Sequence, residues 1–225
     1  MSHNSPMSRN VLGVLSGSDF PDDSLLEWAK SADTVIAADS AGDRLVALGI
    51  SPNIVIGDMD SSKIRWDALK TQVHQDSSQD STDCDKLLSF ASGNRLTLTG
   101  LEGDRLDHVL ATISSVIRGT GEVRLLLRRG WGFVLKGGQD VRLPTIPGQR
   151  FSLIPLSESA VTLENAEWPL DQSHLSLQSL ISVSNRAQGP IRVCIHAGAI
   201  LSVIETKGPP IPDWSEPLWP QNQSP

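Results

Sequence analysis

A short segment with two closely spaced aspartates, Asn53–Ser62, carries the most direct chemical prediction in the sequence. Three apolar residues, Ile54–Ile56, run into Gly57, and Asp58 and Asp60 follow at alternate positions. Side chains two residues apart in an extended segment point the same way, so both carboxylates should emerge together at the end of a buried strand. Adjacent like charges are costly unless a cation bridges them, and carboxylates with substrate phosphates are typical Mg²⁺ ligands. The segment therefore predicts a Mg²⁺ site, and the competing interpretation is a solvated turn.

Acidic residues also stand beside other predicted strands and helices. Asp39 follows the second predicted strand, and Asp83 and Asp107 lie at two predicted helix starts. Parallel strands end at one edge of an α/β sheet, where ligands bind, so these carboxylates should converge there. Such a pocket needs Mg²⁺ and a polyphosphate for stability. Arg105 lies between a glycine turn and a helix start, where it can reach a phosphate.

Strands and helices are expected to alternate through the first half of the chain. The predicted strands are Val11–Leu15, Thr34–Ala38, Ile54–Ile56 and Arg95–Thr99, and the predicted helices cover 22–30, 41–48, 64–69, 82–93 and 106–117. The last of these helices has the clearest apolar stripe. This alternation predicts a Rossmann-like, three-layer α/β domain with a mostly parallel sheet and helices on both faces.

The pattern changes after Gly121, where short apolar runs follow one another between Pro, Gly, Ser and Asn residues. The runs are Val123–Leu127, Gly132–Leu135, Gln149–Ile154, Ala160–Leu163, Ser179–Ser184, Ile191–Ile195 and Ala199–Ile204. This pattern is typical of an all-β sandwich. The predicted organisation is a disordered leader over 1–10, a catalytic nucleotide-binding domain over 11–120, a β-sandwich domain over 121–207, and a proline-rich tail over 208–225.

The composition narrows the classes of partner and compartment. A formal net charge of −7 over 225 residues argues against nucleic acid or an anionic membrane surface as the main partner. The two cysteines, Cys84 and Cys194, have no metal-ligand or redox spacing, which favours a reducing cytoplasm. Apolar runs such as Ala197–Ile204 are too short to span a bilayer. Residues 1–10 lack the apolar core of a signal peptide.

Other phosphate chemistries are less consistent with the sequence. It contains neither the P-loop pattern G-x-x-x-x-G-K-[ST] nor G-x-G-x-x-G. Asp58-Met59-Asp60 and Gly103–Asp107 do resemble motifs of aspartyl-phosphate phosphatases of the haloacid dehalogenase type. In those enzymes, however, a Gly follows the D-x-D and the motif lies on the first strand. Here Ser61 follows, and two strand–helix units precede.

Five motifs occur in a fixed order along the chain. They are Asp39-Ser40-Ala41, Gly57-Asp58-Met59-Asp60-Ser61, Gln79 with Thr82-Asp83 and Lys86, Gly103-x-Arg105-x-Asp107-His108, and Ser184-Asn185. Together they resemble the thiamine pyrophosphokinase (thiamine diphosphokinase) family, over roughly Val11 to Glu205. The resemblance implies an α/β nucleotide-binding domain followed by a β-sandwich. It also implies a homodimer, with thiamine bound between the catalytic domain and a neighbouring sandwich.

The resemblance implies a Mg²⁺-dependent reaction in which the hydroxyl of thiamine attacks the β-phosphorus of ATP, giving thiamine diphosphate and AMP. Such a transfer needs in-line positioning and neutralisation of charge. The implied metal ligands are Asp58, Asp60 and Asp83, and the implied ATP-binding residues are Asp39, Gln79, Asp83, Lys86 and Arg105. Arg105 would stabilise developing negative charge. Asp107 would orient thiamine or assist removal of the hydroxyl proton.

The implied thiamine-binding residues are Asp107, Ser184 and Asn185. The family also stacks an aromatic residue on thiamine, and the motifs do not select it; the candidates are Trp131, Trp168, Trp214 and Trp219. A further departure is Asp39-Ser40-Ala41-Gly42, where the family has D-G-G-A. A lost glycine there alters how closely the backbone can approach the nucleotide.

Plainer interpretations accompany these assignments. Thr82 and Asp107 are also suited to be helix caps, Lys86 to be a solvated charge, and Ser184-Asn185 to be a turn. Two alternative functions stay open: a related pyrophosphokinase acting on another hydroxymethyl heterocycle such as a pterin, and a non-catalytic thiamine- or nucleotide-binding protein.

Overall fold

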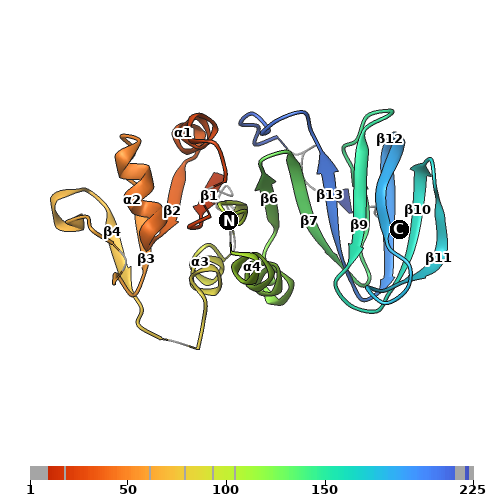
Figure 1. Cartoon of the computed structure of the whole chain (residues 1–225), viewed down its shortest axis with the longest axis horizontal. Helices are drawn as coiled ribbons and strands as arrows, with labels where there is room; N and C mark the ends of the chain where they lie inside the picture. The colour runs from red at the N-terminus through yellow and green to blue at the C-terminus, as the bar shows by residue number, and fades with distance from the viewer. Residues whose placement is uncertain are drawn as a thin grey trace, which may run out of the picture. The chain divides into compact units, whose positions relative to one another are not determined.

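The computed structural model describes residues 10–17, 19–60, 62–78, 80–92, 94–103, 105–215 and 221–222 (Figure 1). The predicted leader therefore lies outside the described residues, except for Asn10. The chain divides into two compact units, Met1–Val123 and Arg124–Pro225. An α/β unit followed by a separate β-rich unit was expected from the sequence, and this coarse organisation is confirmed.

The described part of the first unit is built on five parallel strands. In spatial order they are β5 (Arg95–Thr99), β1 (Asn10–Val14), β2 (Thr34–Ala38), β3 (Ile54–Gly57) and β4 (Gln72–Gln75). The first four are apolar and largely buried, which is why their positions were predictable. All four residues of β4 are exposed, so this strand has no apolar pattern and was not predicted.

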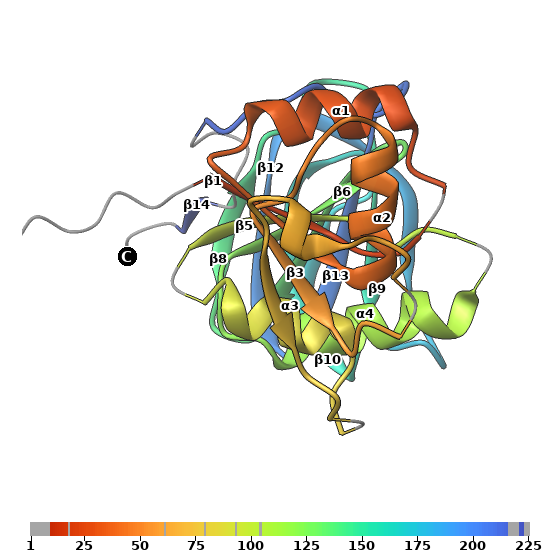
Figure 2. The ribbon, with the colours of Figure 1, turned by 90° about the vertical axis from the view of Figure 1, so that its left-hand side faces the viewer.

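In the described residues of this unit, four α-helices flank these strands: α1 (Asp22–Ser31), α2 (Asp39–Ala47), α3 (Asp83–Phe90) and α4 (Leu106–Arg118). Figure 2 shows α1 crossing the top of this unit and α4 lying below the strands. The predicted helix over 64–69 was wrong, because only Trp66–Ala68 forms a single 3₁₀ turn. In that turn the indole of Trp66 is buried, and its Nε1 donates to the Ser62 hydroxyl.

Glycines allow two of the helices to pack closely on opposite faces of the strands. A Cβ on Gly42 of α2 would lie 3.0 Å from Val55 of β3, and a Cβ on Gly13 of β1 would lie 2.8 Å from Leu87 of α3. Through β2, Gly13 is in register with Ile54, the neighbour of Val55. Because adjacent residues of a strand face opposite ways, α2 and α3 cover different faces.

The turn after β5 meets the turn after β1 at a point where only glycine fits. Gly100 has a φ of +75°, and a Cβ there would lie 2.1 Å from the Leu15 carbonyl oxygen. The Gly17 N–H donates to the Gly100 carbonyl at 2.6 Å, which ties the two turns together. Both turns stand at the carboxyl ends of their strands, where ligands bind in α/β folds.

Replacing Gly100 by alanine is therefore expected to destabilise the protein by about 3 kcal/mol, because the Leu15 backbone must move as well. Gly49 is a matched control, since its φ is +80° but nothing lies within 4 Å of a Cβ there. Gly49→Ala should lower the free energy of unfolding by only about 1 kcal/mol, the cost of a positive φ for a residue with a Cβ. Urea unfolding of both variants measures the difference, and equal losses would contradict the proposed steric cause.

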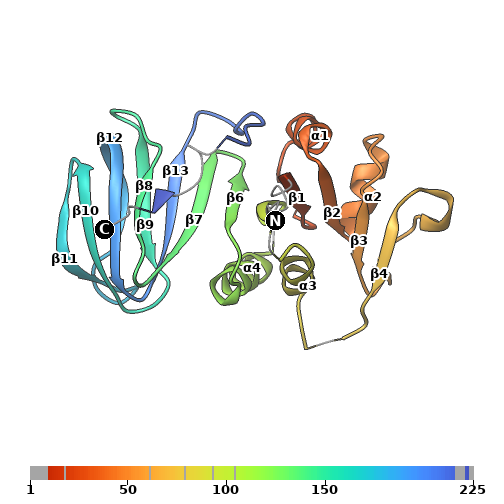
Figure 3. The ribbon, with the colours of Figure 1, turned by 180° about the vertical axis from the view of Figure 1, so that it is seen from behind.

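The second unit consists of strands in the described residues. They are β6 (Val123–Leu127, which begins at the boundary), β7 (Gly130–Lys136), β8 (Asp140–Leu143), β9 (Arg150–Pro155), β10 (Ser159–Ala166), β11 (Leu170–Leu175), β12 (Ser182–Ala197), β13 (Ala199–Glu205) and β14 (Gln221–Asn222). Among the described residues, each pairing within this unit is antiparallel, and Figure 3 shows β8 from behind.

The longest strand, β12, passes from one set of partners to another. Its beginning, Ser182–Arg186, pairs with β9, and its remainder pairs with β10 and β8. From the sequence, this stretch was predicted as two separate runs, Ser179–Ser184 and Ile191–Ile195, because Pro, Gly, Ser and Asn residues lie between the apolar runs. That interpretation was wrong: the Gly189 carbonyl accepts from the Thr145 hydroxyl at 2.7 Å, and the strand continues.

Candidate active site

A cleft of about 500 Å³ opens in the first unit beside the carboxyl ends of its strands. The turns after β1, β3 and β5 and the first turns of α3 and α4 contribute its walls. Its lining includes the predicted site residues Asp58, Asp83, Lys86 and Arg105, together with Ser16, Gly17, Ser78, Ser81, Thr82, Cys84, His108 and Thr112. The cleft thus lies at the edge of the sheet where the acidic residues were expected to converge.

Three carboxylates gather at this edge. One carboxylate oxygen each from Asp39, Asp58 and Asp60 lies within 4.8 Å of the other two. Asp39 is buried at the first position of α2, and Gly57 makes room for it, since a Cβ on Gly57 would lie 3.1 Å from Asp39 Oδ2. Between the two aspartates of the D-x-D segment, Met59 has a φ of 65°. These donors suit a hard cation such as Mg²⁺.

The electrostatics of Asp58 favour its ionised form. The Asp60 N–H donates to Asp58 Oδ1 at 3.2 Å. This backbone hydrogen bond is the main cause that lowers the pKa of Asp58, and the positive charge of Lys86 lowers it further. An ionised Asp58 is ready to bind a cation without first losing a proton.

Asp83 lies outside the group of three, although the sequence analysis grouped it with Asp58 and Asp60. It is the half-buried first residue of α3. Burial raises the pKa of Asp83, and the nearby negative charge of Asp39 raises it further. Asp83 therefore experiences the charge of the acidic group and would be stabilised by a cation there.

Two side chains of α2 hold the loops that border the acidic group. Arg44 donates to the Gly17 carbonyl at 3.1 Å, which fixes the turn after β1. Asp43 Oδ1 accepts from the Ser62 hydroxyl at 2.7 Å, and the Trp66 indole donates to the same hydroxyl at 2.9 Å. These roles could not be predicted from the sequence, because the partners of both residues are about 20 or more positions away along the chain.

The two positively charged side chains of the predicted site, Lys86 and Arg105, lie at helix starts. Lys86 Nζ donates to the Asp76 carbonyl at 2.7 Å and lines the cleft. Arg105 forms two hydrogen bonds to Asp107, Nε to Oδ1 at 3.0 Å and Nη2 to Oδ2 at 2.7 Å. The bonds from Arg105 lower the pKa of Asp107 to about 2. Gln79, predicted to bind ATP, lies outside the described residues.

Cys84 also lines the cleft but is not suited to nucleophilic chemistry. Its side chain is buried, and burial raises the pKa of the thiol to about 12. The reactive thiolate is therefore scarce at neutral pH. This agrees with the sequence analysis, which did not assign Cys84 a nucleophilic role.

The first turn of α3 is held by a capping box, in which Thr82 is the helix cap that the sequence suggested. The Thr82 hydroxyl accepts from the Asp85 N–H at 3.1 Å, and Asp85 Oδ2 accepts from the Thr82 N–H at 3.0 Å. Burial alone would raise the pKa of Asp85. Hydrogen bonds from Thr82, Ser115 and Arg118 outweigh that effect and lower the pKa from 3.8 to about 2.

This lowered pKa predicts a pH-dependent contribution to stability. The contribution is present above the unfolded-state pKa and is lost as the pH falls from about 4 through about 2. Asp85→Asn should therefore lower the free energy of unfolding at pH 7 by about 2 kcal/mol. Urea unfolding from pH 7 to pH 3 should show the gap between variant and wild type narrowing. A gap of constant size would show that the carboxylate charge is not its cause.

The two predicted thiamine-binding residues of the second unit lie on β12. Asn185 is buried, its Nδ2 donates to the Trp168 carbonyl at 2.8 Å, and its Oδ1 accepts from the Trp168 N–H at 3.2 Å. Ser184 is exposed with a φ of 59°, and its N–H donates to the Ser152 hydroxyl at 3.1 Å. The motif thus fixes the backbone of an exposed tryptophan.

The four aromatic candidates differ in exposure. Trp168 is 55% exposed. Trp131 is buried with its ring 4.6 Å from the Arg124 guanidinium, and the ring of Trp214 lies 5.3 Å from the same group. Trp219 lies outside the described residues. Among the described candidates, Trp168 is therefore the one whose side chain is most accessible to a ligand.

The fold and the site together define a class of protein. Parallel strands with an acidic group at their carboxyl edge, and with Lys86 and Arg105 at the cleft wall, are suited to binding metal-complexed phosphates.

In the part of the chain that the structure describes, no helix has the length and apolar character needed to cross a membrane.

Comparison with known proteins identifies the family. Residues 25–125 match the model "Thiamin pyrophosphokinase, catalytic domain", and residues 139–200 match "Thiamin pyrophosphokinase, vitamin B1 binding domain". The chain therefore belongs to the thiamin pyrophosphokinase family, as its motifs indicated. This confirms the predicted enzyme class, a thiamine diphosphokinase, with formation of thiamine diphosphate as the family activity.

Individual relatives agree with this result. The thiamine pyrophosphokinase of Bacillus subtilis (strain 168) is 28% identical over 165 residues, covering 67% of this chain and 76% of that protein. The crystal structure of a Bacillus subtilis thiamine pyrophosphokinase matches with a TM-score of 0.71 at 23% identity, covering 88% of this chain and 99% of that one. A Candida albicans structure gives 0.73 at 16% identity, covering 89% and 90%. These structures share the fold of this chain.

Proposed function

We propose that this member of the family transfers the pyrophosphoryl group of ATP to the hydroxyl of thiamine, with Mg²⁺ as the metal. The products are thiamine diphosphate and AMP. The observation that carries the proposal is the group of Asp39, Asp58 and Asp60, which gathers beside a cleft with a lysine and an arginine in its wall. Three carboxylates at one point fit a hard divalent cation, and that cation fits a triphosphate.

The proposed reaction exchanges one P–O bond for another. The hydroxyl oxygen of thiamine bonds to the β-phosphorus, the bond from that phosphorus to the bridging oxygen of AMP breaks, and the hydroxyl proton leaves. A bound Mg²⁺ would supply charge neutralisation to the phosphates. Arg105 neutralises charge that develops during transfer, and Lys86 and Gln79 bind the nucleotide. Asp107 orients thiamine or receives the proton.

The proposed metal ligands are Asp58 and Asp60, and Asp39 joins them because its oxygens lie in the same group. Asp83, a ligand according to the resemblance, is proposed to act on the metal or its bound phosphates from the start of α3. Its raised pKa supports proximity to the other carboxylates, because part of the shift comes from their charge.

The second unit is proposed to contribute thiamine binding through Ser184 and, indirectly, Asn185. Asn185 fixes the Trp168 backbone, and the exposed Trp168 ring is proposed to stack on thiamine. Trp168→Ala should then raise the KM for thiamine and leave the KM for ATP unchanged. An unchanged KM for thiamine would remove Trp168 from the site.

The finer organisation of the chain is also a proposal. Residues 11–120 are proposed as a Rossmann-like nucleotide-binding domain and 121–207 as a β-sandwich domain, with 208–225 as a tail. Parallel strands with helices on both faces support the first, and the antiparallel strands of the second unit support the second. A homodimer is expected from the resemblance, and a cytoplasmic location is expected from the two cysteines, which have no metal-ligand or redox spacing.

A substrate panel tests the proposal. Purified protein is incubated with ATP, Mg²⁺ and either thiamine or a hydroxymethylpterin, and AMP and the diphosphorylated product are followed by chromatography. Equimolar AMP and thiamine diphosphate are expected, with no product from the pterin. Turnover of the pterin alone would favour the related pyrophosphokinase, and ATP binding without AMP release would favour a non-catalytic binding protein.

A further inference from the structure

We infer that Asp85 and Arg118 are positioning residues for the reaction: together they hold the first turn of α3, which carries Asp83 and Lys86, in a fixed place against α4. This inference rests on the proposed function, because it concerns the same cleft. Neither residue lines the cleft itself. Asp85 and Arg118 affect the cleft through the start of α3.

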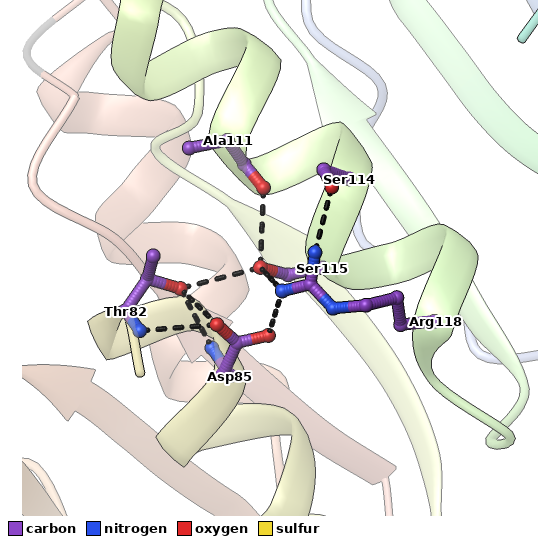
Figure 4. Close-up of polar contacts among 6 residues, drawn as sticks. All are labelled: Thr82, Asp85, Ala111, Ser114, Ser115 and Arg118. Atoms are coloured by element: carbon purple, nitrogen blue, oxygen red, sulfur yellow. Dashed lines mark hydrogen bonds and ion pairs between the residues drawn. The ribbon is translucent and has the colours of Figure 1, made fainter. Parts of the chain in front are cut away.

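Figure 4 shows the network that joins the two helices. Arg118 Nη2 donates to Asp85 Oδ1 at 2.7 Å and to the Ser115 hydroxyl at 3.3 Å, and Nη1 donates to the Ser114 hydroxyl at 2.7 Å. The Ser115 and Thr82 hydroxyls lie 3.2 Å apart. A single guanidinium therefore connects two serines of α4 to the carboxylate that caps α3.

The network consists of local contacts within α3 and long-range contacts to α4, and the two sets fix different features of α3. The capping box between Thr82 and Asp85 is local, so it sets where α3 begins but not where α3 lies. The contacts to Ser115 and Arg118 come from residues 33 positions further along the chain, and they fix that start against α4. Ser115 is 1% exposed, so α3 cannot shift along α4 without breaking the hydrogen bonds of this buried serine.

The cleft residues are coupled to this anchor by helix geometry. Asp83 and Lys86 are three residues apart, so they share one side of α3, and Thr82 and Asp85 share the adjoining side. The Lys86 N–H donates to the Thr82 carbonyl at 3.1 Å. A rotation or slide of the first turn would therefore displace both cleft residues together.

Arg118→Met tests the inference, because it removes the fork of donors and keeps an apolar stem. Affinity for the non-hydrolysable analogue α,β-methylene-ATP is measured by calorimetry with Mg²⁺, alongside kcat, the KM values and the Mg²⁺ concentration for half-maximal rate. We expect affinity for the analogue to fall about tenfold, as for other residues that orient a site from behind. The Mg²⁺ requirement should rise, and the KM for thiamine should stay unchanged. Arg118→Lys should recover only part of the loss, since lysine lacks the fork.

The matched control is Arg95→Met. Arg95 pairs with Glu122 at 3.2 Å in the same unit, but it begins β5, at the end of that strand away from the cleft. Arg118→Met should also unfold at a lower urea concentration, because Asp85 loses a hydrogen bond that lowers its pKa. Affinity is therefore measured without urea, where both variants are folded, and only Arg118→Met should lose analogue affinity. Unchanged affinity in Arg118→Met, or an equal loss in Arg95→Met, would overturn the inference. Loss of affinity in Arg118→Met would support it even if the wild type formed no thiamine diphosphate, an outcome that would refute only the proposed function.

Discussion

Replacing Asp58 by asparagine is expected to lower kcat for thiamine diphosphate formation by about a thousandfold, which corresponds to about 4 kcal/mol of transition-state stabilisation. Asp58 lies in the group of three carboxylates and also lines the cleft. Its pKa is lowered, so the carboxylate is charged at neutral pH. An amide of the same shape keeps one oxygen but loses the charge that balances a divalent cation.

Steady-state kinetics over a range of Mg²⁺ concentrations measure this effect. Part of the lost rate should return at high Mg²⁺, because the remaining carboxylates still bind the metal weakly. Asp67→Asn is the control, since Asp67 is an exposed aspartate in the neighbouring 3₁₀ turn and pairs with Arg65. A rate for Asp58→Asn within tenfold of the wild type at low Mg²⁺ concentration would rule out the assignment of Asp58 as a metal ligand.

Replacing Arg105 by alanine should lower kcat by about 100- to 1000-fold, the range for loss of one preorganised donor to developing charge. Arg105 lines the cleft, and its two hydrogen bonds to Asp107 orient the guanidinium. Both side chains are more than half exposed, so the ion pair itself adds little to stability. The loss should therefore appear in the rate and not in the urea midpoint.

The sequence offers a matched control with the same spacing. Arg65 pairs with Asp67 at 2.8 Å, also two residues apart and also exposed, but it lies outside the cleft. Arg65→Ala should leave kcat unchanged. If Arg105→Ala raised only the KM for ATP and kept the wild-type kcat, Arg105 would bind the nucleotide without stabilising the transition state.

Several parts of this fold could be predicted from the sequence because the signals are local. Buried strands such as β2 and β3 are continuous apolar runs, and the capping box at Thr82 lies within four residues. Strands without an apolar face were missed, as β4 illustrates, since all of its residues are exposed. The two runs that merge into β12 were separated in the prediction because the bond that holds Gly189 comes from Thr145, 44 positions away.

In the site, too, local signals could be predicted from the sequence and long-range contacts could not. The closeness of Asp58 and Asp60 was predictable from alternation along one strand end. Their grouping with Asp39 was only partly foreseen, because it depends on Gly57 leaving space across two neighbouring strands. The pairing of Arg118 with Asp85 could not be predicted from the sequence, since the two residues belong to different helices and neither is a defining residue of a family motif.

The most direct test of the proposed metal site is a crystal of the protein grown with Mn²⁺ and α,β-methylene-ATP, whose bond at the cleavage position cannot be broken. Mn²⁺ replaces Mg²⁺ at oxygen-rich sites, and its anomalous scattering marks its position. We predict a Mn²⁺ peak bonded to oxygens of Asp58 and Asp60, with Asp39 beside it and the triphosphate extending toward Arg105. A nucleotide bound in the cleft with Mn²⁺ held by other residues would contradict the account.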